Sequence, residues 1–78
     1  MGTSPQHRPA YKRLCKSLKA QREAADLTQR ALAEMLGRPH SYVAKVEHGD
    51  RRIDPIEFVE WCRACGTDPA EQLAAFRV

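Results

Sequence analysis

The sequence predicts an all-α fold of five helices, and two observations support this class. Apolar residues recur three and four positions apart in successive segments, whereas no segment alternates apolar and polar residues as a half-buried strand would. Between these segments stand glycine, proline and aspartate residues at positions suited to end one helix and begin the next. A chain of 78 residues has room for one compact domain with a modest core, so a partner subunit is expected.

The N-terminal region is expected to be a flexible tail followed by the first helix. Residues 1–9 contain two prolines and little that could pack against a core, so they form the predicted tail. Residues 10–25 are predicted to form a helix that Asp26 ends. The inner stripe of this helix consists of Tyr11, Leu14, Leu18 and Ala25.

Two short helices joined by a tight turn are predicted between Thr28 and Gly49. The Thr28 hydroxyl can accept a hydrogen bond from a free backbone N–H at the start of the first of these helices. The apolar stripe of that helix consists of Leu32, Ala33 and Leu36. Alanine at position 33 is small enough for the two helices to cross closely at this point.

Glycine and proline mark the turn between these two helices. Gly37 can adopt the left-handed conformation that ends a helix, and Pro39 suits the first turn of the next one. The second helix is expected over about residues 39–48, where Val43 and Val46 would hold it against the core. Its outer face then carries polar side chains, namely His40, Ser41, Tyr42, Lys45 and His48. A row of polar donors on a protruding helix is what the major groove of DNA accepts.

The C-terminal third contains one helix-start signal twice. Asp54 to Glu57 and Asp68 to Glu71 each place an aspartate cap, a proline at the first helical position and a glutamate at the third. The first signal opens a helix expected to reach Cys65, and the second opens the last helix. The domain is therefore expected to span residues 10–78, with the helix-turn-helix at about 28–49 and the helices of 54–78 used for packing and dimerisation.

The charge is distributed unevenly along the chain. The net charge is +3, and residues 1–52 hold eleven lysines and arginines against five acidic residues. Residues 53–78 hold two basic against five acidic residues. This asymmetry predicts one side of the domain that faces a polyanion and another side, acidic and apolar, that associates with a second copy.

The central segment resembles the phage-repressor and Cro-like helix-turn-helix proteins, the XRE group of bacterial and phage transcription regulators. The matching residues are Leu27-Thr28-Gln29, Leu32-Ala33, Leu36-Gly37, Val43, Val46, Glu47 and Gly49, with Arg22 upstream. The resemblance covers roughly residues 14–69. It implies a compact five-helix, lambda-repressor-like DNA-binding domain.

The resemblance also implies which residues read DNA bases. His40, Ser41 and Lys45 match base-reading positions, although the family often carries glutamine in place of His40. Tyr42 departs from the glycine or threonine usual in the family. It could contact DNA, through a sugar-phosphate or a thymine methyl group, or it could fold back as packing. We include Tyr42 in the predicted base-reading set.

Phosphate contacts are expected at both ends of the recognition helix. Arg38 precedes the helix, and Arg51 and Arg52 follow it, where the DNA backbone would pass. His48 matches a family position near the DNA backbone. In the family, the position of Gln29 either hydrogen-bonds a phosphate or supports the first residue of the recognition helix.

Two further sets of residues are assigned structural roles. The resemblance implies a salt bridge between Arg22 and Glu47. Leu73, Phe76 and Val78 offer more apolar surface than a short terminal helix needs for docking, so they are the predicted dimer interface.

The cysteines do not indicate a metal site or a redox centre. Cys62 and Cys65 form a C-x-x-C pair, but a zinc site needs two more ligands, and Cys15 and His7 are weak candidates without suitable spacing. Reactive C-x-x-C thiols lie at helix N-termini, whereas this pair is predicted at a helix C-terminus, within a core stripe. We therefore expect no metal and no cofactor.

These observations favour a sequence-specific DNA-binding transcriptional regulator, a repressor that binds a palindromic operator in double-stranded DNA as a homodimer. No nucleophile–base pair or phosphate loop suggests an enzyme, and no segment suggests a membrane span or secretion, so a cytoplasmic protein is expected. The alternative is a protein-interaction module, such as an antitoxin or a restriction-modification controller component, whose C-terminal helices bind a partner protein.

Overall fold

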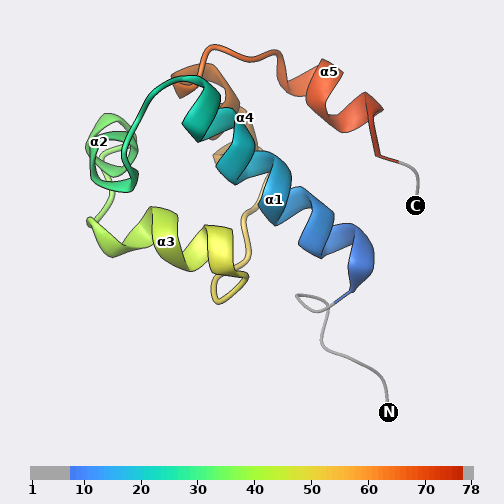
Figure 1. Cartoon of the computed structure of the whole chain (residues 1–78), viewed down its shortest axis with the longest axis horizontal. Helices are drawn as coiled ribbons and strands as arrows, with labels where there is room; N and C mark the ends of the chain where they lie inside the picture. The colour runs from blue at the N-terminus through green and yellow to red at the C-terminus, as the bar shows by residue number, and fades with distance from the viewer. Residues whose placement is uncertain (1–7, 77–78) are drawn as a thin grey trace.

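The computed structural model describes residues 8–76 of the chain. Within these residues it contains five α-helices and no strand, which confirms the predicted all-α class (Figure 1). The helices are α1 Pro9–Ala24, α2 Gln29–Met35, α3 Ser41–His48, α4 Pro55–Ala64 and α5 Pro69–Ala74. Residues 1–7 of the predicted tail, and Val78 of the predicted dimer interface, lie outside the described residues.

The first helix ends at Ala24, one residue earlier than expected, and the predicted Asp26 follows in the turn after it. Asp26 adopts a left-handed conformation with φ of 61°, and the Leu27 N–H returns to the Arg22 carbonyl at 3.2 Å. Together with the Ala25 N–H, which donates to the same Arg22 carbonyl at 3.2 Å, this pairing closes the end of the helix. It also turns Leu27 back against the core, where its side chain is partly buried.

The turn between α2 and α3 depends on Gly37. Its φ of 67° is a left-handed conformation, and the following Arg38 N–H donates to the Ala33 carbonyl at 2.9 Å. A Cβ at this position would meet no atom within 4 Å, so the backbone angle is what requires glycine. The α3 helix begins at Ser41 rather than at Pro39. The Pro39 carbonyl instead accepts from the Tyr42 N–H at 2.9 Å, which closes a four-residue turn that leads into the helix.

The predicted caps of the other helices are present. The Thr28 hydroxyl accepts from the Ala31 N–H at 3.0 Å at the start of α2. At the start of α4 the Asp54 carboxylate accepts from the Glu57 N–H at 2.7 Å, and the Glu57 carboxylate accepts from the Asp54 N–H at 3.1 Å. This reciprocal capping box fixes where α4 begins after the loop that follows α3.

The core forms where α1, α2, α3 and α4 meet. Its completely buried side chains are Leu18, Leu32, Ala33, Val43, Val46, Trp61 and Cys62. The Trp61 indole N–H donates to the Leu18 carbonyl at 3.1 Å, so the largest core side chain leaves no polar atom unsatisfied. The valines of α3 are thus buried as the sequence predicts, which leaves the opposite face of α3 toward solvent.

The last helix is the least packed element. No residue of α5 is buried, and Leu73 is 53% exposed. Phe76 follows the end of α5 and is only partly buried. None of the helices among residues 8–76 combines the length and the apolar character needed to cross a membrane.

Candidate nucleic-acid interface

The outer face of α3 carries a stripe of polar side chains. Ser41, Lys45 and His48 lie four and then three positions apart, which places them on one side of the helix, and all three are exposed. Lys45 and His48 stand in the last turn, before Gly49 ends the helix in a left-handed conformation with φ of 82°. A lysine, an imidazole and a hydroxyl on one exposed helix face can donate hydrogen bonds to base edges or phosphates.

The prediction that Tyr42 lies on this outer face is wrong. The residue is only 5% exposed, and its ring lies 6.3 Å from the Trp61 ring in a tilted arrangement. Tyr42 is one position before Val43 and four before Val46, so it belongs to the buried side of α3. Burial raises the pKa of its hydroxyl above the ordinary value. The exposed base-reading candidates are therefore His40, Ser41 and Lys45.

His40 lies just before the first residue of α3 and is exposed. Its Nε2 atom is 3.1 Å from a carboxylate oxygen of Glu34, at the end of α2. Glu34 also lies 3.6 Å from the Arg30 guanidinium. All three side chains are more than half exposed, so these pairs stabilise the fold little and can exchange for a ligand.

A buried ion pair joins α1 to the last turn of α3. The Arg22 Nε atom lies 2.6 Å from Glu47, and a second guanidinium nitrogen lies 3.2 Å from the other carboxylate oxygen. Arg22 also donates to the Leu27 carbonyl at 2.8 Å, and Gln29 donates its amide N–H to Glu47 at 3.0 Å. Gln29 thus supports the end of α3 and not its first residue. The amide hydrogen that it donates to Glu47 already has a partner inside the protein.

Two of the predicted phosphate-binding arginines share one acid. Glu57 accepts from Arg38 at 2.7 Å and from Arg51 in a two-pronged pair at 2.9 and 3.0 Å. The two guanidinium carbons lie 4.8 and 5.0 Å from the centre of the Tyr42 ring. Both arginines therefore have partners inside the domain, and they connect the residues before and after α3 to α4.

The arginines set the acidity of Glu57. The hydrogen bonds from Arg51, helped by the Asp54 N–H and the charge of Arg38, lower the pKa of the carboxyl from 4.5 to about 2, against the opposing effect of burial. Glu57 is therefore ionised at every pH where the protein would operate. Its sequence position indicated only the helix cap, and the ion pairs come from tertiary packing.

The positive charge available for a polyanion is smaller than the composition suggests. Arg22, Arg38 and Arg51 each face a carboxylate at ion-pair distance, whereas Lys45 and Arg52 are exposed without an ion pair among residues 8–76. The Arg52 guanidinium lies 4.9 Å from the centre of the Tyr11 ring. Of the predicted phosphate contacts, His48 and Arg52 are the exposed ones.

The three thiols are free and inward-facing. Cys15 and Cys62 are buried, and Cys65 is half-buried at the end of α4. Burial raises the pKa of each thiol, that of Cys65 to about 11. Within the described part of the chain, no group of three histidine, cysteine or acidic side chains is arranged to hold a metal ion.

Comparison with known proteins places these features in a family. A helix-turn-helix family model matches residues 18–72, which include all of α2, α3 and α4. Among solved structures, the chain is similar to an XRE-family like protein from Pseudomonas syringae pv. tomato str. DC3000. The two are 47% identical and superpose with a TM-score of 0.83, over 87% of this chain and 83% of that one. No curated protein sequence matches the chain.

Proposed function

The chain belongs to the XRE-type helix-turn-helix family of DNA-binding regulators, and we propose that it is a repressor that binds a palindromic operator as a homodimer. The observation that carries this proposal is the exposed stripe of Ser41, Lys45 and His48 on α3. The buried Arg22–Glu47 pair and the two valines hold the opposite side of the helix. The stripe therefore stands on a rigid support, as base recognition requires.

Within this function each exposed side chain has a distinct role. Lys45 donates to guanine oxygen and nitrogen in the major groove, and His40 and Ser41 contact neighbouring base edges. Arg52 and His48 contact phosphates and fix the register of the helix on the duplex. Because the ligand is genomic DNA, the protein acts in the cytoplasm.

Removal of Lys45 tests the role of α3. The preferred sequence is first selected from a randomised pool of duplexes, and binding is then measured with each single base-pair variant. We expect Lys45→Ala to lose about 1–3 kcal/mol of discrimination at one base pair and to keep it at the others. Arg52→Ala should instead weaken binding to all sequences and lower the salt slope by about one.

Arg63→Ala is the matched control, because Arg63 is an exposed basic residue of α4 in the acidic part of the chain. It should leave both discrimination and salt slope unchanged. If wild type and Lys45→Ala discriminated equally between base pairs at every position of the duplex, α3 would not be the recognition helix. Failure to select any preferred duplex would favour the alternative of a protein-interaction module.

The dimer is tested by sedimentation on DNA. One recognition helix reads too few base pairs for useful affinity, whereas two copies with helices about 34 Å apart read two half-sites. Leu73 and Phe76 supply apolar surface for the contact between copies. We expect two chains per duplex that carries both half-sites and one chain per duplex that carries a single half-site. One chain on the complete operator at saturating protein would exclude the dimer.

A further inference from the structure

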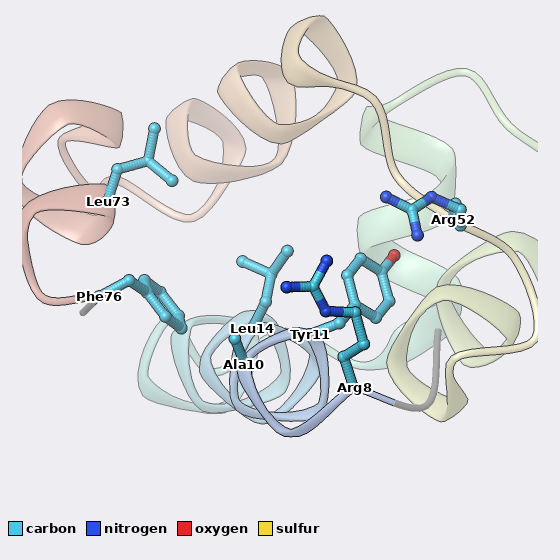
Figure 2. A pocket seen from close by; sticks show the side chains of 7 residues that line it. All are labelled: Arg8, Ala10, Tyr11, Leu14, Arg52, Leu73 and Phe76. Carbon is cyan, nitrogen blue, oxygen red and sulfur yellow. The ribbon is translucent and has the colours of Figure 1, made fainter. Parts of the chain in front are cut away.

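A groove of about 290 Å³ lies between the N-terminal half of α1 and the end of α5 (Figure 2). Its lining consists of Arg8, Ala10, Tyr11, Leu14, Arg52, Leu73 and Phe76. The volume is close to the lower end of the range for small-molecule sites, about 300–1,000 Å³. The groove is separate from the exposed stripe of α3 and plays no part in the base contacts proposed above.

The two ends of the groove differ in chemistry. Figure 2 shows Leu73 and Phe76 on one side, with Leu14 facing the space between them and the arginines. Arg8 and Arg52 lie at the other side, on either side of the Tyr11 ring in this view, and the Arg52 guanidinium is 4.9 Å from the centre of that ring. An occupant that matches this lining has an apolar body and an anionic end.

The cationic end is not neutralised by the protein. No acidic residue within the described part of the chain lines the groove, and neither Arg8 nor Arg52 forms an ion pair there. The Tyr11 hydroxyl accepts the Ile53 N–H at 3.0 Å, which leaves the hydroxyl proton to be donated to an acceptor. Two guanidinium groups and one hydroxyl donor suit a carboxylate, which accepts several hydrogen bonds at once.

We propose that this groove binds a small monocarboxylate with an apolar chain, of the medium-chain fatty acid class. The carboxylate is held by Arg8 and Arg52, and the chain lies along Leu14, Leu73 and Phe76. Burial of the chain against apolar side chains supplies affinity, and the guanidinium groups select an anion over a neutral or cationic molecule.

The site is connected to the loop that follows α3. Arg52 belongs to that loop, and the Tyr11–Ile53 hydrogen bond ties the same loop to α1. Arg52 is also a proposed phosphate contact, so a carboxylate bound to it competes with the DNA backbone. This regulatory step rests on the proposed function, whereas ligand binding itself does not.

Calorimetric titration of the free protein with octanoate tests the site. We expect saturable binding at one site per chain, at least tenfold weaker binding of 1-octanol, and no binding of octylammonium. Arg52→Gln and Leu73→Gln should each lower octanoate affinity about tenfold. Both positions are exposed or half-exposed, so the variants are expected to fold, and circular dichroism checks this.

Two variants serve as matched controls. Arg63→Gln removes an exposed arginine outside the groove, and Met35→Gln removes an apolar side chain that is 56% exposed on α2. Both should bind octanoate as wild type does. Absence of saturable binding, equal binding of octanoate and octanol, or equal losses in test and control variants would overturn the proposal.

The regulatory step has its own readout. Octanoate should weaken operator binding by wild type. Because Leu73 is also a proposed dimer contact, operator binding by Leu73→Gln is compared only with and without octanoate, and the weakening should require about tenfold more octanoate than in wild type. Octanoate that binds the groove without changing operator affinity would overturn the coupling. A protein that binds no duplex would refute the repressor function. The octanoate titration of the free protein would still show whether the groove binds a carboxylate.

Discussion

Replacement of Glu47 by glutamine is expected to destabilise the domain by about 3–5 kcal/mol. The side chains of Arg22 and Glu47 are 10% and 1% exposed, so both charges have left water and depend on each other. Glutamine has nearly the same shape, but it leaves the Arg22 guanidinium charged and buried without a counter-charge. The free energy of unfolding from urea denaturation at neutral pH measures the loss.

Glu34→Gln is the matched control for this prediction. Glu34 also pairs with a basic side chain, Arg30, but the two are 60% and 73% exposed. Its removal should change stability by no more than about 0.5 kcal/mol. Equal effects of the two substitutions would mean that burial of the Arg22–Glu47 pair does not determine its contribution.

A double variant separates the pair from its surroundings. Replacement of both Arg22 and Glu47 by apolar residues of similar volume should cost less than Glu47→Gln alone, because no unpaired charge remains. The result also bears on function, since this pair fixes the last turn of α3 beside Lys45 and His48. We expect the double variant to fold and to bind its operator more weakly than wild type.

The parts of the fold that could be predicted are those that depend on neighbours in sequence. The capping box of Asp54 and Glu57 and the left-handed Gly37 are local signals, and the helices begin and end within two residues of the expected positions. Val43 and Val46 are buried as their spacing indicates. In each case the decisive interaction spans only a few residues.

Tyr42 shows where a local pattern is insufficient. Adjacent helical positions differ by about 100°, so Ser41 and Tyr42 point to different sides, and a tyrosine suits either a DNA contact or a core. The deciding neighbours are Trp61 on α4 and Arg51 in the loop after α3, and both come close to Tyr42 only in the folded domain. Its position one residue before Val43 was the available signal for burial.

Glu57 was predicted as a cap but not as the partner of two arginines. Its contacts with Arg38 and Arg51 span 19 and 6 residues in sequence. The arginines were predicted to contact phosphates because they flank the recognition helix. Within the domain they pair with Glu57, and contact with phosphates stays a prediction. Charge counts along a sequence therefore overestimate the positive surface wherever arginines find carboxylates inside the domain.

Replacement of Glu57 by glutamine is expected to remove about 2–3 kcal/mol of stability at neutral pH. The pKa of Glu57 is about 2 in the folded protein, below the ordinary 4.5. That difference corresponds to about 3 kcal/mol, which we reduce because Arg38 and Arg51 are about one-third exposed. Glutamine can still fill the capping box, so the substitution reports on the charge.

The sign of the pH dependence follows from the depressed pKa. Glu57 contributes its full stabilisation above pH 4.5, and the contribution falls as the pH is lowered toward 2, where the carboxylate gains a proton in the folded protein. The difference in unfolding free energy between wild type and Glu57→Gln should therefore be largest at pH 7 and shrink steadily between pH 4.5 and 2. Urea denaturation across this range gives the difference directly, with other carboxylates cancelling between the two proteins.

Glu60→Gln provides the comparison on the same helix, because Glu60 is exposed on α4 and has no ion pair among residues 8–76. Its effect should stay within about 0.5 kcal/mol at every pH. If the loss of unfolding free energy in Glu57→Gln persisted unchanged at pH 2, the shape of the Glu57 side chain rather than its charge would account for its contribution to stability. A deficit that disappears on acidification would instead show that the two arginines flanking α3 are held by the ionised carboxylate, and so would tie the placement of the recognition helix to one charge on α4.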